Sequence, residues 1–486
     1  MLDQSFSAKN FEIIYNRESR KGNIDLHDMP EDYQSAVHAY VDCRKNMREF
    51  IQRPKKMRTS TYNDDLELLQ QEVADLKKHK ELVLKQYFED VAKMVNSKKF
   101  RFAVKSSYIE FNGKKKEIFS LEGGIEGFYV MKQLQYNISR TFKVKQSNRY
   151  TILECIKPLL SSKIPLWVIR TDISSFYESI PQERLLCMVN NNSLLSSKSK
   201  SLIKVLLTLF EQKKDTTQIQ PGIGIPRGIG ISPLLSEIYM REIDNHIKSN
   251  AEVVSKAEVV FYARYVDDIF IICKPGHSLS IEDYYNKTLC NLFSGYGLEL
   301  KNKDLNGDKC ELIDLTSENR DEISFDYLGY KLYIYIYPKK EGTKVDFDLS
   351  NNKRAHIKHK IDSIITHCEN LACIDMQSAR RDLLDGLRLL SCNYSLSKSK
   401  HRVKVGLYYT NNLLTRTDGL CEMTKYLHEK ALSPRGKLLI APTDDSKRYF
   451  EHLNNRIQRL DLEKAWNEKL YYPFTMKRLK EMETWL

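Results

Sequence analysis

The stretch "YARYVDDIFII" (residues 262–272) places two adjacent aspartates, Asp267 and Asp268, inside an otherwise apolar run. Aromatic and β-branched residues on both sides predict two strands that meet at a tight turn, although this turn contains neither Gly nor Asn. Departures from ordinary turn chemistry are expected at functional sites. A hairpin turn with two solvated acids would give the same pattern, so a functional interpretation needs support from elsewhere in the chain.

A third carboxylate ends another apolar run, in "IPLWVIRTDISSFYESIP" (residues 164–181). The run predicts a short buried strand that ends at Asp172. Carboxylates on neighbouring strand ends repel one another unless a divalent cation lies between them, and two Mg²⁺ ions about 3.5–4 Å apart need bridging carboxylate oxygens. The three aspartates together therefore indicate a metal site.

A glycine-rich loop lies between the acidic positions, in "PGIGIPRGIGISPLLSEIYMREIDNHI" (residues 221–247), and a helix is predicted from Ser232-Pro233 onward. The loop is not a dinucleotide fingerprint, because Arg227 stands where the last glycine should be, and it lacks the Gly-Lys-Ser/Thr of a phosphate-binding P-loop. Its glycines instead suit close backbone contact with a nucleotide base or a template strand.

The composition favours a polyanionic partner. At 486 residues, with 41% hydrophobic and 29% charged residues, the chain is typical of a globular protein with two or three domains. Lys+Arg 77 against Asp+Glu 64 gives a net charge of +13, which favours nucleic acid or an acidic membrane surface. No signal peptide and no apolar run of about 18 residues is seen, so we expect a cytoplasmic protein with no membrane segment.

The remaining segments predict a mixed α and β protein. Apolar residues at helical spacing predict one long helix or two stacked ones over residues 63–96, and "RFAVKSSYIEFNGKKKEIFSL" (residues 101–121) predicts two strands joined at Asn112-Gly113. Alternation in "FDYLGYKLYIYIY" (residues 325–337) predicts a half-buried strand. Beyond residue 350 the chain is helix-like and basic with interspersed tyrosines, a pattern that suits single-stranded nucleic acid and also a solvated helix face.

Three stretches together resemble the palm motifs of the reverse transcriptase family. They are "RTDISSFYESI" (170–180), "IPRGIGISPLL" (225–235) and "RYVDD" (264–268), in the family's order and with 267 − 172 = 95 residues between the acidic positions. The resemblance implies an α+β right-hand polymerase with fingers, a palm built on an antiparallel sheet, a thumb, and here a helical C-terminal extension. We expect an N-terminal helical region at 1–97, fingers and palm at 98–340, and thumb with a basic helical region at 341–486.

The resemblance also implies roles for single residues. Asp172 and Asp267 would bind two Mg²⁺ ions, with the carbonyl of Ile173 as a further ligand and Asp268 assisting. Tyr177 matches the aromatic gate that rejects a 2′-hydroxyl. The further candidates are Arg149, Arg227 and Gly228 for nucleotide binding, and Lys309, with Lys303 second, as the general acid that protonates pyrophosphate. The family more often has Gln at the position of Arg227.

The implied activity is that of an RNA-directed DNA polymerase that uses dNTPs, an RNA template and two Mg²⁺ ions, and that releases a DNA product. No RNase H or Cys/His nuclease motif accompanies it, so the chain resembles the bacterial defence-associated reverse transcriptases, and its opening "MLDQSFSAKNF" is similar to the first polymerase subunit of the type 3 systems. That implies a cognate non-coding RNA, a second polymerase subunit and antiphage defence. The alternatives are an RNA-dependent RNA polymerase, an untemplated nucleotidyl transferase and a catalytically idle RNA-binding scaffold.

Overall fold

The computed structural model describes most of the chain, namely residues 2–54, 60–97, 100–111, 114–162, 164–215, 219–249, 257–276, 280–301, 310–315, 322–337, 342–396, 403–433 and 447–485. Within these ranges the fold is a mixture of helices and antiparallel sheets. No described helix is both long enough and apolar enough to cross a membrane.

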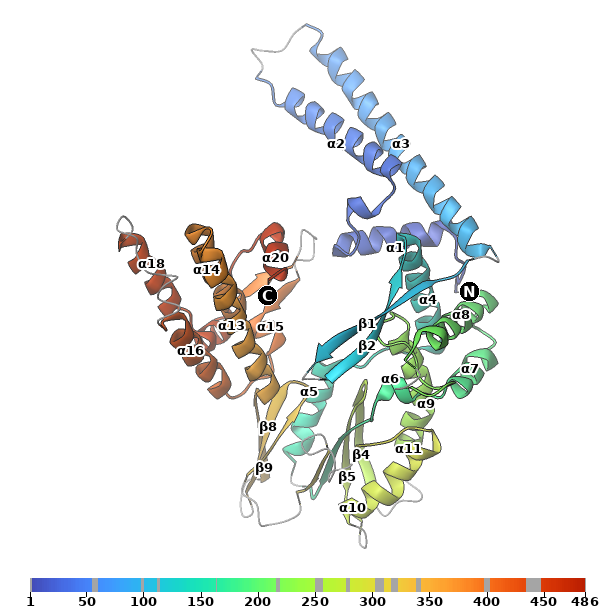
Figure 1. The fold of residues 1–486 in the computed structure, drawn as a ribbon, viewed down its shortest axis with the longest axis vertical. Helices are drawn as coiled ribbons and strands as arrows, with labels where there is room; N and C mark the ends of the chain where they lie inside the picture. Colours follow the sequence, from blue (N-terminus) through green and yellow to red (C-terminus); the bar gives the residue numbers. More distant parts are fainter. Residues whose placement is uncertain are drawn as a thin grey trace.

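The N-terminal region is helical. Its elements are α1 (Ala8–Lys21), η1 (Leu26–Asp28), α2 (Glu31–Ile51) and α3 (Tyr62–Asn96). Helices α2 and α3 pack against each other as a long hairpin that projects from the body of the molecule (Figure 1). The helix predicted over residues 63–96 is confirmed as one continuous helix. Only its C-terminal half carries buried residues, Leu84, Phe88, Val91 and Val95, because only that half reaches the body.

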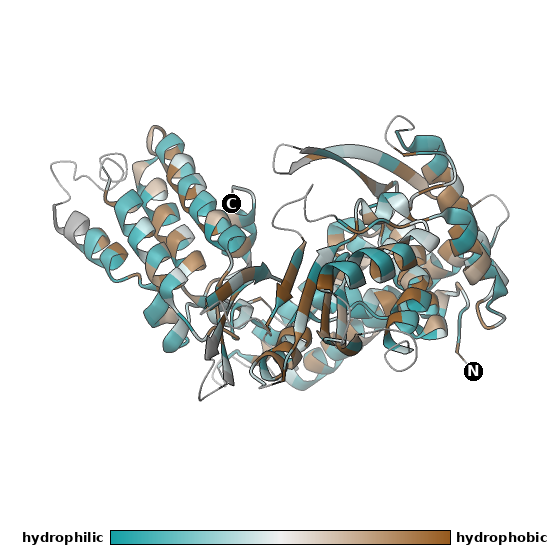
Figure 2. Cartoon of the chain, turned by 90° about the horizontal axis from the view of Figure 1, so that it is seen from below, coloured by the Kyte–Doolittle hydropathy of each residue, from teal (hydrophilic) through white to brown (hydrophobic). Residues whose placement is uncertain are grey.

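A central four-stranded sheet carries the two predicted acidic positions. Its strands, in the spatial order β4-β5-β3-β6, are β4 (Glu258–Tyr265), β5 (Asp268–Lys274), β3 (Trp167–Asp172) and β6 (Glu311–Asp314), and all pairs are antiparallel. Successive residues of β5 pack into two different cores, Ile271 into one and Phe270 and Ile272 into the other. Both faces of the sheet are therefore covered, and brown apolar strands lie at the centre of the chain in Figure 2.

Two further antiparallel sheets flank this centre. The hairpin of β1 (Ala103–Phe111) and β2 (Lys114–Glu122) follows α3, and the three-stranded sheet has β7 (Glu322–Tyr327), β8 (Tyr330–Tyr337) and β9 (Gly342–Leu349) in that order. The predicted hairpin is thus confirmed, although the turn Asn112-Gly113 lies outside the described residues. The stretch 325–337 is divided by a turn between β7 and β8, and the predicted half-buried strand is β8. Leu332 and Ile334 on β8 are fully buried, as the alternation predicts.

Helices surround the central sheet on both sides. Between the hairpin and β6 these are α4 (Ile125–Phe142), α5 (Arg149–Leu160), α6 (Phe176–Ser179), α7 (Gln182–Asn191), α8 (Ser197–Lys213), α9 (Ser232–Ser249), α10 (Ile281–Tyr284), η3 (Tyr285–Cys290) and α11 (Asn291–Gly295). The C-terminal region contains α13 (Asn351–Ala372), α14 (Met376–Ser391), β10 (Asn393–Ser395), β11 (Lys404–Gly406), α15 (Leu407–Thr410), α16 (Asp418–Ala431), α18 (Lys447–Gln458), α19 (Leu462–Asn467) and α20 (Met476–Glu483).

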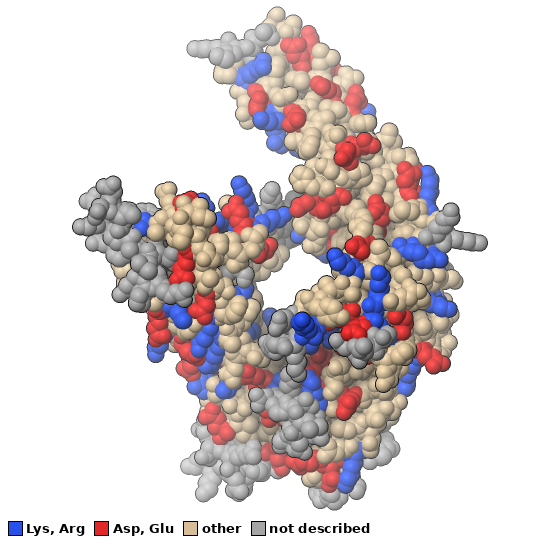
Figure 3. All heavy atoms as spheres, in the orientation of Figure 1, with Lys and Arg blue, Asp and Glu red and all other residues tan. Residues whose placement is uncertain are grey.

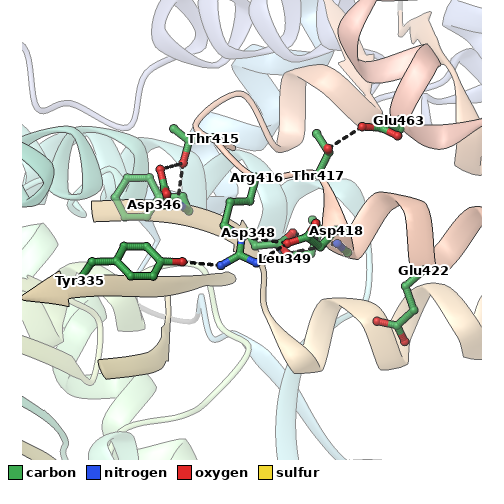
Figure 4. Close-up of polar contacts among 12 residues, drawn as sticks. Tyr335, Asp346, Asp348, Leu349, Thr415, Arg416, Thr417, Asp418, Glu422 and Glu463 are labelled. Atoms are coloured by element: carbon green, nitrogen blue, oxygen red, sulfur yellow. Dashed lines mark hydrogen bonds and ion pairs between the residues drawn. The ribbon is translucent and has the colours of Figure 1, made fainter. Parts of the chain in front are cut away.

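A buried carboxylate attaches this C-terminal region to the three-stranded sheet. Asp348 on β9 is fully buried and accepts hydrogen bonds from the Arg354 guanidinium at 2.9 Å and from the Gly419 backbone at 3.2 Å. Arg354 also donates to Glu422 at 2.9 Å. Figure 4 shows a second contact, in which Arg416 donates to the hydroxyl of Tyr335. Since these residues come from β8, β9, α13 and α16, the network fixes the C-terminal helices on the sheet.

The C-terminal and N-terminal regions also meet each other. The ammonium group of Lys480 on α20 lies 3.1 Å from the carboxylate of Asp25, just before η1. The space-filling view shows an opening that passes through the molecule between the C-terminal region, the N-terminal region and the β1-β2 hairpin, with Lys and Arg side chains on its rim (Figure 3). The Lys480–Asp25 contact closes the ring of protein around this opening.

Candidate active site

The turn that carries Asp267 has a strained backbone. Val266 adopts a φ of 60°, in the left-handed region that β-branched residues normally avoid. The guanidinium of Arg264 holds this turn, since it donates to the Val266 carbonyl at 2.8 Å. Arg264 is itself buried and paired with Glu237 and Asp244 of α9, at 2.8 and 3.0 Å. The helix that follows the glycine-rich loop therefore positions the acidic turn.

Asp172 and Asp267 lie side by side. The Ile173 amide donates to the Asp267 carbonyl at 3.1 Å, which joins the end of β3 to the turn. Asp172 is only 6% exposed. Burial raises the pKa of the Asp267 carboxyl above its usual value, and the charge of Asp172 raises it further. The charge of Asp172 thus disfavours the ionised form of Asp267, and a carboxylate placed in this way attracts a cation.

Asp268 is aligned with Asp172 in the register of β5 and β3. Its charge acts on Tyr327 of β7, whose hydroxyl has a pKa raised first by burial and then by Asp268. The backbone therefore places Asp268 beside the other two aspartates. The charge of Asp268 also acts on Tyr327 in the three-stranded sheet.

A lysine stands beside the paired aspartates. Lys301 forms an ion pair with the carboxylate of Asp172, and its amide donates to the Asp172 carbonyl at 3.0 Å. This lysine was not among the residues selected from the sequence. The predicted general acid Lys309 and its alternative Lys303 lie outside the described residues. Leu298 and Leu300 are buried, Leu300 pairs with Ile173 and Lys301 follows it, so the alternation of apolar residues just before Lys301 is the signal that could have identified it.

Tyr177 lies close to this group. It is on the short helix α6, and burial raises the pKa of its hydroxyl, a hydrogen bond with Ser236 lowers it, and the charge of Asp267 raises it again. The aromatic ring is therefore within electrostatic reach of Asp267. The residues Asp172, Asp267 and Tyr177, selected from two separate motifs, are brought together by the fold.

The glycine-rich loop is hydrogen-bonded to helix α6, which carries Tyr177, and to strand β2 of the β1-β2 hairpin. The amide of Ile225 donates to the Tyr177 carbonyl at 2.7 Å, and the amide of Phe119 on β2 donates to the Arg227 carbonyl at 2.7 Å. Gly228 has a φ of 96°, and a Cβ atom there would lie 2.6 Å from the Phe119 carbonyl oxygen. This close approach explains the glycine at position 228 in terms of the β1-β2 hairpin.

Arg149 is placed elsewhere. It begins α5, after the side-chain cap of Asn148, and its charge acts on Tyr330 and Lys353 at the three-stranded sheet. Burial, followed by the charge of Arg149, lowers the pKa of Lys353 to about 8. The described interactions of Arg149 are thus with the start of α13 and with β8, and its predicted contact with a nucleotide stays a prediction.

The donor set at the aspartates fits magnesium. Carboxylate and carbonyl oxygens are the ligands that Mg²⁺ prefers, and the mutual repulsion of Asp172 and Asp267 is of the kind a divalent cation relieves. The described residues contain no cluster of three or more His, Cys, Asp and Glu side chains that could bind a metal by themselves. The two carboxylates would therefore need a backbone ligand, which the Ile173 carbonyl can supply, and ligands from the substrate.

The fold and site together define a class of protein. An antiparallel palm sheet with paired aspartates at its strand ends, a fingers hairpin attached to a glycine-rich loop, and a helical thumb region are the parts of a right-hand polymerase. Residues 126–332 match the family described as reverse transcriptase (RNA-dependent DNA polymerase). These residues are therefore a reverse transcriptase domain, and the enzyme class is that of an RNA-directed DNA polymerase.

Solved structures similar to this chain include two telomerases. One is telomerase from Candida albicans in complex with a fragment of telomeric RNA, at 11% identity and a TM-score of 0.34, covering 76% of this chain and 67% of that one. The other is apo telomerase from Candida tropicalis, at 12% identity and a TM-score of 0.36, covering 80% and 65%. The chain thus spans about two thirds of the length of each. No curated protein matches the sequence.

Proposed function

We propose that the protein synthesises DNA from dNTPs on an RNA template, with Asp172 and Asp267 at the catalytic centre. The observation that carries this proposal is the pairing of the buried carboxylate of Asp172 with the half-buried carboxylate of Asp267, from two motifs 95 residues apart (267 − 172), beside the ring of Tyr177. Burial and then the charge of Asp172 raise the pKa of Asp267, and the net direction stays upward although Lys301 pairs with Asp172 and acts to lower it.

Asp172, Asp267 and the Ile173 carbonyl would hold two Mg²⁺ ions, and Asp268 would assist. When bound, the ions would neutralise charge on the triphosphate and lower the pKa of a primer 3′-hydroxyl. The chain itself contributes the fixed geometry. Arg264 holds the Val266 carbonyl, so the carboxylate of the next residue is held in place before the substrate arrives.

Tyr177 would select deoxynucleotides. Its ring is half-buried and lies on the helix that follows directly after the Asp172 strand, so a nucleotide bound at the aspartates would place its sugar near the ring. A 2′-hydroxyl would then collide with the ring. This favours reverse transcription over the synthesis of RNA.

The template and the biological role follow from charge and from the resemblance of the motifs. A net charge of +13 and the Lys and Arg side chains on the rim of the central opening support a nucleic acid in that opening (Figure 3). We infer that the RNA is a cognate non-coding RNA, that the protein acts in the cytoplasm in antiphage defence, and that a second polymerase subunit accompanies it.

The test is nucleotide incorporation by the purified protein with its bound RNA, Mg²⁺ and each labelled dNTP or NTP, followed by sequencing of product and RNA. We expect a DNA product complementary to the RNA. Asp267→Ala should lower incorporation by about a hundred-fold or more without changing the far-UV circular dichroism spectrum or RNA binding. Asp75→Ala, on the exposed part of α3, removes a carboxylate of the same kind and should retain activity.

Three results would contradict the proposal. Undiminished synthesis by Asp267→Ala would mean that the catalytic site lies elsewhere. A product unrelated in sequence to the bound RNA would indicate untemplated nucleotidyl transfer. RNA binding with no incorporation of any nucleotide would indicate a scaffold.

A further inference from the structure

Arg227 is held by two side chains of the neighbouring helix α6. Its Nε donates to one carboxylate oxygen of Glu178 at 2.9 Å and its Nη2 donates to the other at 3.0 Å. The same guanidinium lies over the ring of Tyr177, at 5.3 Å from the ring centroid. Arg227 thus contacts two consecutive residues, of which one is the proposed sugar gate.

The geometry makes this a specific contact. A planar guanidinium matches a carboxylate through two parallel hydrogen bonds, and it is attracted to the face of an aromatic ring within about 6 Å. The side chains of Arg227 and Glu178 are only 28% and 26% exposed, so solvent screens the pair less than it would a surface pair. Loss of either partner would release the other.

The backbone of Arg227 is fixed as well. Its carbonyl accepts from Phe119 of the β1-β2 hairpin, and the Ile225 amide two residues earlier donates to Tyr177. The guanidinium therefore cannot shift without disturbing the fingers hairpin or α6. It forms a rigid support against one side of the Tyr177 ring, and Phe176 packs beside that ring with centroids 5.5 Å apart.

We propose that Arg227 and Glu178 are positioning residues that hold the Tyr177 ring where it excludes a 2′-hydroxyl, and so determine the selectivity between deoxynucleotides and ribonucleotides. This inference rests on the proposed function and extends it. The sequence analysis selected Arg227 as a residue that binds the nucleotide, and it did not select Glu178. In the structure the guanidinium of Arg227 is hydrogen-bonded to Glu178 and packs against the ring of Tyr177.

The experiment measures kcat and KM for single-nucleotide incorporation of a dNTP and of the matching rNTP, and takes the ratio of the two kcat/KM values. Arg227→Gln and Glu178→Gln should each lower this ratio by about three- to five-fold, the size expected for loss of a cation–π contact. The change should come mainly from a lower KM for the rNTP. Arg227→Lys keeps the charge but loses the two-point contact, and it should retain an intermediate ratio.

A double-mutant comparison shows whether the effect passes through Tyr177. In a Tyr177→Ala background, Arg227→Gln and Glu178→Gln should leave the ratio unchanged, because no ring remains to be positioned. Arg184→Gln is the matched control. Arg184 lies 3.8 Å from the centroid of the Tyr296 ring and 3.2 Å from Glu242, the same pair of contacts in another part of the chain, and its loss should not change the ratio.

Two results would overturn the inference. An equal loss of kcat/KM for both sugars in Arg227→Gln would mean that Arg227 binds the nucleotide directly. An undiminished effect in the Tyr177→Ala background would mean that the pair acts without the ring. If the unaltered protein incorporates neither sugar, the proposed function fails, and this inference fails with it.

Discussion

Carboxylates removed from solvent have two different roles in this protein. Glu18 in α1 is 1% exposed and surrounded by donors, with Asn23 at 2.8 Å and Lys21 at 3.0 Å. Burial acts to raise its pKa, but the hydrogen bonds from Asn23, Lys21 and Lys132 outweigh it and lower the pKa to about 2. The pKa of Asp267 moves the opposite way. A satisfied carboxylate stabilises the fold, whereas a repelled pair is suited to bind a cation.

Glu18→Gln should therefore destabilise the protein in a pH-dependent way. The folded pKa of about 2 lies below the ordinary value of 4.5. The ionised group thus stabilises the fold above pH 4.5, and this contribution is lost as the pH falls toward 2. We expect the variant to lose roughly 2 kcal/mol at pH 7 and much less near pH 3, measured by denaturant unfolding at both pH values. Equal losses at the two values would show that the charge of Glu18 does not matter.

The residues that sequence reasoning selected are those whose signal is local. Asp172, Asp267 and Tyr177 stand in short motifs, and the structure brings them together. Lys301 stands in no such motif. Glu178 lies within the first motif, but what distinguishes each of these two residues is its partner, 129 residues away along the chain for Lys301 and 49 for Glu178. Partners at such separations are set by the fold, so a single sequence does not show them.

At the scale of elements, the contact between the β1-β2 hairpin and the glycine-rich loop depends on one glycine. Gly228→Ala would place a Cβ atom 2.6 Å from the Phe119 carbonyl and would also strain a φ of 96°. Gly222 has a φ of 74° with open space around it, so Gly222→Ala tests the strain alone. We expect Gly228→Ala to cost about 1–3 kcal/mol more than Gly222→Ala.

Hydrogen exchange gives the local measurement for this pair of variants. Exchange of the Phe119 amide, which donates to Arg227, should become faster in Gly228→Ala and stay slow in Gly222→Ala. Similar exchange in both variants would show that the hairpin does not depend on this contact.

Elements with a strong period were predictable, and their pairing was not. The long helix α3, the strand ending at Asp172 and the hairpin around Asp267 are all present where the apolar pattern predicts them. The order β4-β5-β3-β6 and the attachment of α16 to β9 through Asp348 could not be predicted, because a period identifies which face is buried but not what covers it.

At the scale of the whole molecule, an exposed ion pair joins the C-terminal and N-terminal regions that border the opening. Lys480 and Asp25 are 59% and 60% exposed, and such pairs are worth roughly 0.2–1 kcal/mol. Asp25→Lys would replace attraction by repulsion, and the exchange Asp25→Lys with Lys480→Asp would restore it. We expect Asp25→Lys to speed the binding of a circular single-stranded RNA by about two- to five-fold and to leave the binding rate of a linear RNA unchanged. The double variant with Asp25→Lys and Lys480→Asp should bind the circular RNA at the original rate.

The control for this prediction is the linear RNA of the same sequence, measured by stopped-flow association with each variant. A change of the same size for linear and circular RNA would mean that the two charges act on binding in general and not on entry into the opening.

The Lys480–Asp25 contact has a topological consequence. A circular strand has no free end and cannot thread a closed protein ring. It can be captured only while the Lys480–Asp25 contact is broken. Once this contact re-forms, the circular strand and the protein ring are topologically linked. A strand with a free end can leave by sliding, whereas a circle cannot. The same weak contact would therefore govern residence time on a circle and be almost irrelevant to residence time on a short linear strand.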